Sequence, residues 1–311
     1  MLMQNRKVII LGSGPAGCTA ALYVARAMMS PLVIQGIQPG GQLTIASEIE
    51  NYPGFIDPVK GTWLMQQMEI QATNYGAEVV MDHIVKVFLD EYPFKLIGDG
   101  GTTYSCSALI ICTGAQARWL GLPSEEKFKG YGVSACATCD GFFFRDKEVV
   151  VVGGGNTAVE EALFLTNFAK RVTLIHRRDE LKAENVLQDR LFKNKAINVV
   201  WNTVIDEIKG YNEPRQVTHV VLHNVKTEVS YELAADGVFV AIGHSPATDL
   251  FKGQLDMRND GYIHTHPNST TTSIPGVFAA GDVTDNVFRQ AITSAGMGCM
   301  AALEAERWLS A

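Results

Sequence analysis

Lys7-Val8-Ile9-Ile10-Leu11-Gly12-Ser13-Gly14-Pro15-Ala16-Gly17 is the stretch of sequence that decides the fold. A short apolar run of strand length ends at Gly12, and residues 16–28 are rich in alanine with helical spacing. Strand, glycine turn and helix in this order are the context that a dinucleotide-binding fingerprint requires. Its glycines permit a tight turn, a close approach of the backbone to a pyrophosphate and close helix packing. The phosphates bind N–H groups at the start of the helix.

The same order recurs later in the chain. Residues 148–152 read as a buried parallel strand, residues 153–158 as a second glycine turn, and residues 158–168 as a helix. A single fingerprint is weak evidence. Two of them, each after an apolar strand and before a helix, indicate an internal duplication and predict two nucleotide-binding domains.

Further apolar strands that end in glycine predict how the domains close. Residues 108–114 and 237–243 each close one domain, whereas residues 276–282 come after the second domain is complete. The first domain is therefore predicted to be split, with residues 1–117 and 247–311 in one domain and residues 118–246 inserted. The predicted fold class is α/β, with two Rossmann-like three-layer ββα/αβα nucleotide-binding domains.

Bulk composition excludes several classes of protein. A length of 311 residues with 47% hydrophobic and 19% charged content fits a soluble globular protein of two domains. A net charge of −7 argues against general nucleic-acid binding. No apolar run approaches the roughly 20 residues of a membrane span. Residues 1–7 lead straight into a strand and leave no room for a signal peptide, so we expect a cytoplasmic protein.

Cys136-Ala137-Thr138-Cys139-Asp140 is the local cysteine pair among six cysteines. In a reducing compartment such a pair is catalytic or metal-binding rather than structural. Tetrahedral zinc needs four ligands, and no second pair follows at finger spacing, so we expect no metal. The other cysteines are interpreted as small buried hydrophobes; they are Cys18, Cys106, Cys112 and Cys299.

Basic residues at the end of the second strand of the inserted domain identify its cofactor. An NAD site places an acidic residue there to bind the ribose 2′-OH. Here the strand ends in His176-Arg177-Arg178, with Lys182 one turn further on, which suits a 2′-phosphate. We therefore expect NADPH. The predicted binding residues are Gly153, Gly155, Asn156, Thr157, Ala158, His176, Arg177, Arg178, Lys182, Ile242 and Gly243.

The matching region of the first domain, residues 32–36, carries neither an acid nor a base. Its fingerprint alone leaves FAD and NAD both open. Gly281-Asp282 resolves the choice, because a strand that ends in Gly-Asp can direct a carboxylate at a ribityl hydroxyl, which flavins carry and nicotinamides lack. We therefore expect FAD in this domain.

These motifs together resemble those of the bacterial low-molecular-weight thioredoxin reductases, and the resemblance runs essentially end to end. A dithiol inside the NADPH domain is its specific mark, since flavoenzymes of the glutathione-reductase type carry theirs in the FAD domain. The matching segments are residues 12–17, 40–43, 50–54, 136–143, 153–158, 176–179, 243–246, 281–283, 289–291 and 298–302.

The resemblance implies one non-covalent FAD per subunit, a homodimer, and oxidised thioredoxin as substrate. Gly36 is the usual residue at its position, which accounts for the missing acid. Lys182 stands where an arginine is common, so charge is retained while bidentate phosphate contact is lost. Cys112 replaces an alanine and is interpreted as a packed thiol. The implied FAD-binding residues are Gly12, Ser13, Gly14, Pro15, Ala16, Gly36, Gly41, Gln42, Leu43, Asn51, Thr113, Gly114, Gly281, Asp282, Arg289, Gln290 and Ala291.

The resemblance also implies a reaction sequence. NADPH reduces FAD, FAD reduces the Cys136–Cys139 disulfide, and the dithiol reduces thioredoxin through a mixed disulfide. By this resemblance, Cys139 faces the flavin and Cys136 attacks the partner. Asp140 is interpreted as the proton donor to the departing thiolate; a helix cap is the alternative, and one carboxylate could serve both purposes. The dithiol cannot lie against the flavin and also admit a protein, so the inserted domain is expected to rotate about residues 114–118 and 243–248. Phe142 and Phe143, interpreted as exposed, are candidates for the docking surface.

Other functions predict different sequences. A peroxiredoxin-linked reductase carries an additional N-terminal thioredoxin-like region, whereas here the first fingerprint begins at residue 12. A flavin reductase for ferredoxin would lack the cysteine pair. A binding protein that only senses redox state would not need Cys136, Cys139 and Asp140 together.

Overall fold

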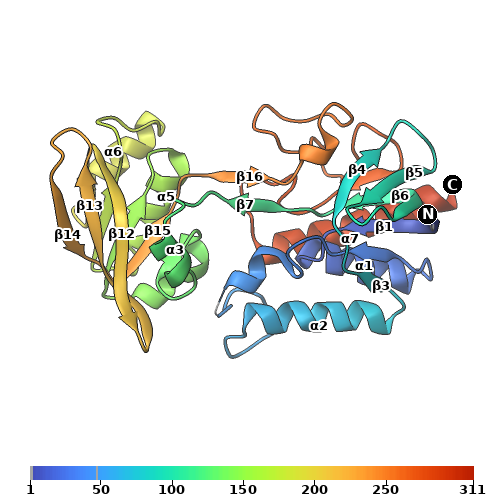
Figure 1. Ribbon diagram of the computed structural model, residues 1–311, viewed down its shortest axis with the longest axis horizontal. Coiled ribbons are helices and arrows are strands. Elements are labelled where there is room, and N and C mark those ends of the chain that lie inside the picture. The colour runs from blue at the N-terminus through green and yellow to red at the C-terminus, as the bar shows by residue number, and fades with distance from the viewer. Residues whose placement is uncertain (1–2, 47) are drawn as a thin grey trace. The chain divides into compact units, whose positions relative to one another are not determined.

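The computed structural model describes residues 3–46 and 48–311, and Figure 1 shows its helices and strands. The chain divides into an outer unit, Met1–Gln116 with Ser245–Ala311, and an inserted unit, Ala117–His244. It passes from one unit to the other in β7 (Ala115–Ala117) and returns in β16 (His244–Pro246), and these two strands pair with each other.

A seven-stranded sheet forms the centre of the outer unit. In order, the strands are β3 (Glu78–Val80), β2 (Leu32–Ile34), β1 (Met3–Leu11), β6 (Thr103–Ile111), β5 (Phe94–Gly98) and β4 (Ile84–Phe88), with β17 (Val277–Ala279) beside β6. β1 is parallel to β2 and to β6, and β17 is parallel to β6, so a strand from the end of the chain completes the sheet that β1 begins. β4 and β5 extend it as an antiparallel pair.

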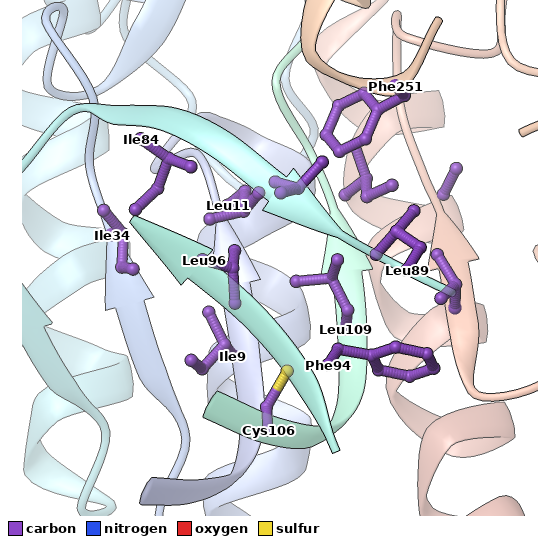
Figure 2. Close-up of a cluster of buried hydrophobic side chains, with 14 of the residues drawn as sticks. Ile9, Leu11, Ile34, Ile84, Leu89, Phe94, Leu96, Cys106, Leu109 and Phe251 are labelled. Atoms are coloured by element: carbon purple, nitrogen blue, oxygen red, sulfur yellow. The ribbon is translucent and has the colours of Figure 1, made fainter. Parts of the chain in front are cut away.

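The two faces of β1 belong to two separate cores. Ile9 and Leu11 lie in the cluster that Figure 2 shows, whereas Val8 and Ile10 lie in a second cluster on the opposite face. A strand that is buried on both faces has no position for a polar side chain. This is why residues 8–11 are continuously apolar and do not alternate with polar residues.

Three helices, α1 (Pro15–Arg26), α2 (Gly61–Asn74) and α7 (Ala291–Ser310), contribute to the second cluster. The contact between α1 and α7 is made of small residues, and a Cβ on Gly298 would lie 2.1 Å from the carbonyl oxygen of Ala16. Two 3₁₀ turns, η1 (Gly41–Ile45) and η3 (Asp249–Phe251), complete the outer unit. Phe251 of η3 packs in the cluster of Figure 2.

The inserted unit is built on a five-stranded parallel sheet. Its order is β11 (Ile197–Val200), β10 (Arg171–Ile175), β9 (Glu148–Val152), β15 (Gly237–Val240) and β8 (Val133–Ser134). A separate antiparallel sheet contains β12 (Thr203–Asn212), β13 (Arg215–Asn224) and β14 (Ser230–Ala234). The helices are α3 (Pro123–Phe128), α4 (Ala137–Asp140), α5 (Asn156–Leu165) and α6 (Asn185–Lys193), and η2 (Gly141–Phe144) follows α4.

Alternate residues of β9 again face different layers. Val149 and Val151 pack with the helices, whereas Val150 and Val152 pack against the antiparallel sheet. The inserted unit therefore has three layers, helices, parallel sheet and antiparallel sheet. The predicted mixed α/β class with parallel sheets is confirmed.

Gly298 and Gly296 form a matched pair for testing the α1–α7 contact. A Cβ on Gly298 would meet the Ala16 carbonyl oxygen at 2.1 Å, whereas a Cβ on Gly296 would meet no atom within 4 Å. We expect Gly298→Ala to lower the free energy of unfolding by more than about 1 kcal/mol, because the helices must move apart. Gly296→Ala should raise it by up to about 1 kcal/mol, because alanine is the better helix former. Urea unfolding measures both, and equal destabilisation by the two changes would contradict this packing.

Candidate functional site

The first glycine turn owes its shape to backbone atoms that approach too closely for side chains. Gly12 has a φ of +104°, and a Cβ there would lie 2.2 Å from the carbonyl oxygen of Cys112. A Cβ on Gly17 would lie 1.9 Å from the carbonyl oxygen of Gly12. Gly14 differs, since no atom lies within 4 Å of its Cβ position. The turn is thus compressed on its inner side and open at the start of α1, where a phosphate can approach the backbone.

The segment that contains η1 is hydrogen-bonded to this turn and packs against it. The N–H of Gly40 donates to Ser13 Oγ at 2.9 Å, and a Cβ on Gly41 would lie 3.5 Å from Gly14 Cα. Gln42 and Leu43 follow within η1. The structure therefore brings this predicted group together with Gly12–Ala16. Gly36 lies just beyond β2, where it has a φ of +77° and its N–H donates to the carbonyl of Asp82.

Asp282 follows β17 and reaches the same region. Its Oδ1 accepts a hydrogen bond from Ser294 Oγ of α7 at 2.8 Å. A Cβ on Gly281 would lie 2.9 Å from Ala16 Cβ, so the Gly281-Asp282 bend packs on the start of α1. Burial raises the pKa of Asp282 to about 6, because the charged form loses hydration. A buried carboxylate of this kind is stabilised by a further hydroxyl donor.

The start of α7 holds the remaining predicted residues of the outer unit. Gln290 is its N-cap and forms a capping box with Thr293. Asn51 Nδ2 donates to Gln290 Oε1 at 3.4 Å, which brings Asn51 beside Arg289-Gln290-Ala291. Thr113 and Gly114 follow β6, and Thr113 Oγ1 donates to the carbonyl of Ala247 at 2.7 Å.

The second glycine turn repeats the geometry of the first. Gly153 has a φ of +156°, and a Cβ there would lie 2.4 Å from the carbonyl oxygen of Ala241. Gly155 is open in the same way as Gly14, and α5 begins at the next residue. Thr157 and the fully buried Ala158 lie in its first turn. Ile242 and Gly243 follow β15, next to the residue that Gly153 approaches.

Residues 176–184 fold over this turn. The N–H of Lys182 donates to the Gly154 carbonyl at 2.7 Å. The side chains of Asn156 and Glu184 are joined at 3.1 Å, and the Glu184 N–H donates to Asn156 Oδ1 at 2.9 Å. Arg177, Arg178 and Lys182 remain exposed, so three of the four predicted basic residues are available to a ligand.

His176 differs from the other basic residues. Its ring lies where a side chain on Gly154 would be, within 2.2 Å of the Cβ position, and the residue is 8% exposed. Burial lowers the pKa of the imidazole, and the neighbouring arginines lower it further. The His176 ring therefore packs against the turn at Gly154 and favours its neutral form. The burial of this residue could not be seen in the sequence, because His176 is the first residue of a basic run.

Cys136 and Cys139 form a disulfide with a Cα–Cα distance of 5.3 Å, and Cys136 caps α4. The N–H of Cys136 donates to Ser134 Oγ at 3.0 Å. Burial raises the pKa of Asp140, at the end of α4, and a hydrogen bond from Ser134 partly offsets this effect. One short segment, residues 134–140, thus contains the cysteine pair, the Ser134 hydroxyl and the Asp140 carboxyl. This carboxyl holds its proton to higher pH than an exposed aspartate does.

Of the two aromatic residues beside the dithiol, Phe142 is exposed and Phe143 is partly buried. Phe142 is 51% exposed and makes an edge-to-face contact with Phe168, with ring centroids 6.1 Å apart. The guanidinium of Arg145 lies 5.6 Å from the centre of its ring. Phe143 packs against the helix-side core, so the expectation that both rings are exposed is wrong for Phe143.

The other cysteines lie in the outer unit. Cys18, Cys106 and Cys112 are buried, and burial raises the pKa of the Cys18 and Cys106 thiols to about 12 and that of Cys112 further still. Cys299 is partly exposed, so its interpretation as a buried hydrophobe is wrong. Among residues 3–46 and 48–311, no group of His, Cys, Asp or Glu could hold a metal ion. Over the same residues, every helix is too short or too polar to cross a membrane.

Comparison with known proteins gives a consistent result. Residues 6–298 match the family model of the pyridine nucleotide-disulphide oxidoreductases. The chain is 59% identical over 304 residues to a thioredoxin reductase of Rickettsia conorii, covering 98% of both chains. Among solved structures it resembles the thioredoxin reductase of Streptococcus pyogenes, with 40% identity, 98% of each chain covered and a TM-score of 0.93. The Lactococcus lactis thioredoxin reductase in its FR conformation also shares 40% identity, over 98% of this chain and 99% of that one, with a TM-score of 0.65.

Proposed function

Since the chain belongs to the pyridine nucleotide-disulphide oxidoreductase family, and within it to the thioredoxin reductases, we propose that it reduces oxidised thioredoxin at the expense of NADPH. The observation that carries this proposal is the Cys136–Cys139 disulfide. It lies in the same unit as the second glycine turn and directly beside the partly buried carboxyl group of Asp140.

The outer unit suits FAD, bound non-covalently. The open side of the first turn at Gly14 leaves room for a pyrophosphate, and Asp282 can accept a hydrogen bond from a ribityl hydroxyl. That hydroxyl would stabilise the carboxylate whose pKa burial raises to about 6. When bound, a flavin accepts hydride from a nicotinamide and passes an electron pair to a disulfide. The chain contributes the binding surface and the thiols.

The inserted unit suits NADPH. The open position at Gly155 is equivalent to that at Gly14, and the exposed side chains of Arg177, Arg178 and Lys182 can bind a 2′-phosphate. His176, because it is buried and favours the neutral form, would act by holding the turn rather than by supplying charge.

The dithiol performs the final transfer. The Cys136 thiolate attacks one sulfur of the thioredoxin disulfide, forms a mixed disulfide and releases a thioredoxin thiolate. Cys139, which faces the flavin in the other half-reaction, then attacks Cys136 Sγ. This step restores the Cys136–Cys139 disulfide and releases the second thioredoxin thiolate. One electron pair and two protons pass to thioredoxin, and Asp140 supplies a proton to the departing thiolate.

Serine at either cysteine tests the relay. Cys136→Ser and Cys139→Ser should each abolish thioredoxin reduction, because a single thiol cannot re-form the disulfide. Both should retain the flavin absorbance and its bleaching by NADPH. Cys299→Ser, at the partly exposed free cysteine, is the matched control and should keep full activity. Thioredoxin reduction by both single variants at the normal rate would refute the proposed function.

Asp140→Asn tests the proton donor. Because burial raises the pKa of Asp140, the wild-type carboxyl keeps its proton to higher pH than an exposed aspartate. Turnover that depends on this proton falls as pH rises through that pKa. We expect Asp140→Asn to lower turnover about a hundredfold and to remove this fall from the pH profile. Flavin reduction by NADPH, followed in single-turnover experiments, should be unaffected. An unchanged pH profile would assign the proton transfer to another group.

We further propose that the inserted unit rotates between half-reactions. Gly114 and Gly243, at the two crossings, have φ values of +71° and +101° and open surroundings. The Streptococcus and Lactococcus structures are each 40% identical in sequence to this chain, but their TM-scores against it are 0.93 and 0.65. The two structures therefore differ from each other. This difference supports a change of arrangement within the family. A crosslink that joins the two units should block steady-state turnover, and full turnover of the crosslinked enzyme would exclude rotation.

The chain is also proposed to act as a homodimer in the cytoplasm, as the family resemblance implies. Apolar side chains on the outer surface of the helices support an interface between copies, among them Tyr23, Ile70 and Leu303. A cavity of about 760 Å³ lies between Tyr23, Tyr52 and Ile70. Analytical ultracentrifugation should give twice the chain mass of 33.9 kDa, and a mass of one chain would exclude the dimer.

A further inference from the structure

The segment proposed to bind the 2′-phosphate has no net charge of its own. Residues 177–184 contain three basic side chains, Arg177, Arg178 and Lys182, and three acidic ones, Asp179, Glu180 and Glu184. Glu184 is joined to Asn156, but Asp179 and Glu180 are exposed next to the arginines. The carboxylates therefore oppose the attraction that the cations exert on an approaching phosphate.

A lysine from another element lies against one of these carboxylates. Lys226, in the turn between β13 and β14, donates from Nζ to Asp179 Oδ2 at 2.5 Å. The two residues are 47 positions apart in the chain. The Lys226 ammonium lowers the pKa of Asp179, which keeps this carboxylate ionised and paired.

The turn that carries Lys226 is well defined. Asn224 Oδ1 accepts hydrogen bonds from the N–H groups of Lys226 and Thr227, both at 3.0 Å. The Glu228 N–H donates to the Asn224 carbonyl at 2.8 Å. The carboxylate of Glu228 lies 3.3 Å from His223 Nε2, on its own hairpin. These hydrogen bonds therefore fix the backbone conformation of the turn that carries Lys226.

The same turn is bonded to the strand end that carries the arginines. Asn202, with a φ of +52°, donates its N–H to the Arg178 carbonyl at 3.0 Å and accepts a hydrogen bond from the Val225 N–H at 2.7 Å. One residue thus connects the backbone of Arg178 to the residue before Lys226. The Lys226–Asp179 pair is a consequence of this backbone arrangement, not only of a long flexible side chain.

We propose that Lys226 contributes to specificity for NADPH over NADH by neutralising Asp179, so that Arg177, Arg178 and Lys182 present a net positive charge to the 2′-phosphate. This inference rests on the proposed use of NADPH. Lys226 acts through Asp179 and is a positioning residue rather than a catalytic one. The pair is solvent-exposed, with side-chain exposures of 59% and 64%, so its influence is expected to be moderate and sensitive to salt.

The test compares the binding of two small probes to the flavin-loaded enzyme by calorimetry. 2′,5′-ADP carries the 2′-phosphate, whereas 5′-AMP lacks it. At low salt we expect Lys226→Ala to weaken 2′,5′-ADP binding about threefold to fivefold, because an exposed charge has an effect of this size. Lys226→Glu should weaken it further, and Lys226→Arg should preserve it. Binding of 5′-AMP should stay the same in all variants, and the differences should shrink at high salt.

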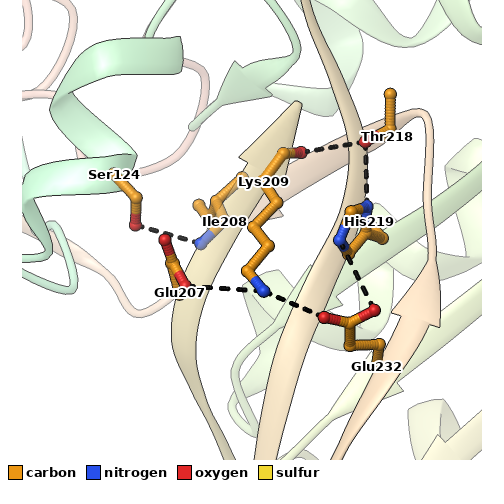
Figure 3. A network of polar contacts seen from close by, with 7 residues as sticks. All are labelled: Ser124, Glu207, Ile208, Lys209, Thr218, His219 and Glu232. Atoms are coloured by element: carbon orange, nitrogen blue, oxygen red, sulfur yellow. Dashed lines mark hydrogen bonds and ion pairs between the residues drawn. The ribbon is translucent and has the colours of Figure 1, made fainter. Parts of the chain in front are cut away.

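Two further variants separate this role from a structural one. Lys209, a partly exposed lysine of β12 that pairs with Glu232 of β14 (Figure 3), is the matched control, and Lys209→Ala should leave both probes unaffected. In the double variant Asp179→Asn with Lys226→Ala, 2′,5′-ADP binding should return close to the wild-type value, since the charge that Lys226 offsets is gone.

The possible outcomes distinguish this inference from the proposed function. If the wild-type enzyme prefers 2′,5′-ADP but Lys226→Ala binds it equally well, Lys226 has no role and only this inference is overturned. If 2′,5′-ADP binding falls but the double variant does not recover, the effect does not pass through Asp179, and the inference is again overturned. If the wild-type enzyme binds 2′,5′-ADP no more tightly than 5′-AMP, the assignment of NADPH itself is wrong.

Discussion

Close backbone approach at two glycine turns is the constraint on which the rest of this structure depends. In each unit the first glycine of the turn faces a carbonyl oxygen just beyond the neighbouring strand, at Cys112 in one and at Ala241 in the other. The Cβ positions would lie 2.2 Å and 2.4 Å from these oxygens. Any side chain there would separate the central strands of the sheet. The same contact in both units makes the internal duplication visible at the level of single atoms.

The two turns differ in the side chains that pack against them. In the outer unit the Gly40 N–H donates to Ser13, and the partly buried Asp282 lies beside the start of α1 and accepts a hydrogen bond from Ser294. A neutral or hydroxyl-bonded carboxyl is favoured there. In the inserted unit a histidine ring fills the space behind Gly154, and exposed cations follow it. Equivalent backbones thus carry a site suited to hydroxyl groups and a site suited to an additional phosphate.

Most of the fold, the two glycine turns and the cysteine pair could be predicted because they depend on local signals. Strands buried on both faces are continuously apolar, and a turn compressed against a carbonyl admits only glycine. The cysteine pair is likewise local, since three residues separate its members along the chain. The burial of His176 and the partial burial of Phe143 were not predictable in this way, because only the packing of other elements covers these side chains. The partial exposure of Cys299 has the same origin.

The sequence by itself determined where the two glycine turns lie and which sulfur atoms can form a disulfide. Each of these properties depends on residues that are close together along the chain. Only the tertiary structure decided which charges are paired. Asp282 meets Ser294, and Asp179 meets Lys226, through loops that bring distant segments together. Electrostatic effects depend on distance in space, and Asp282 and Asp179 lie 12 and 47 positions from these partners, so the partners can be identified only once the chain has folded.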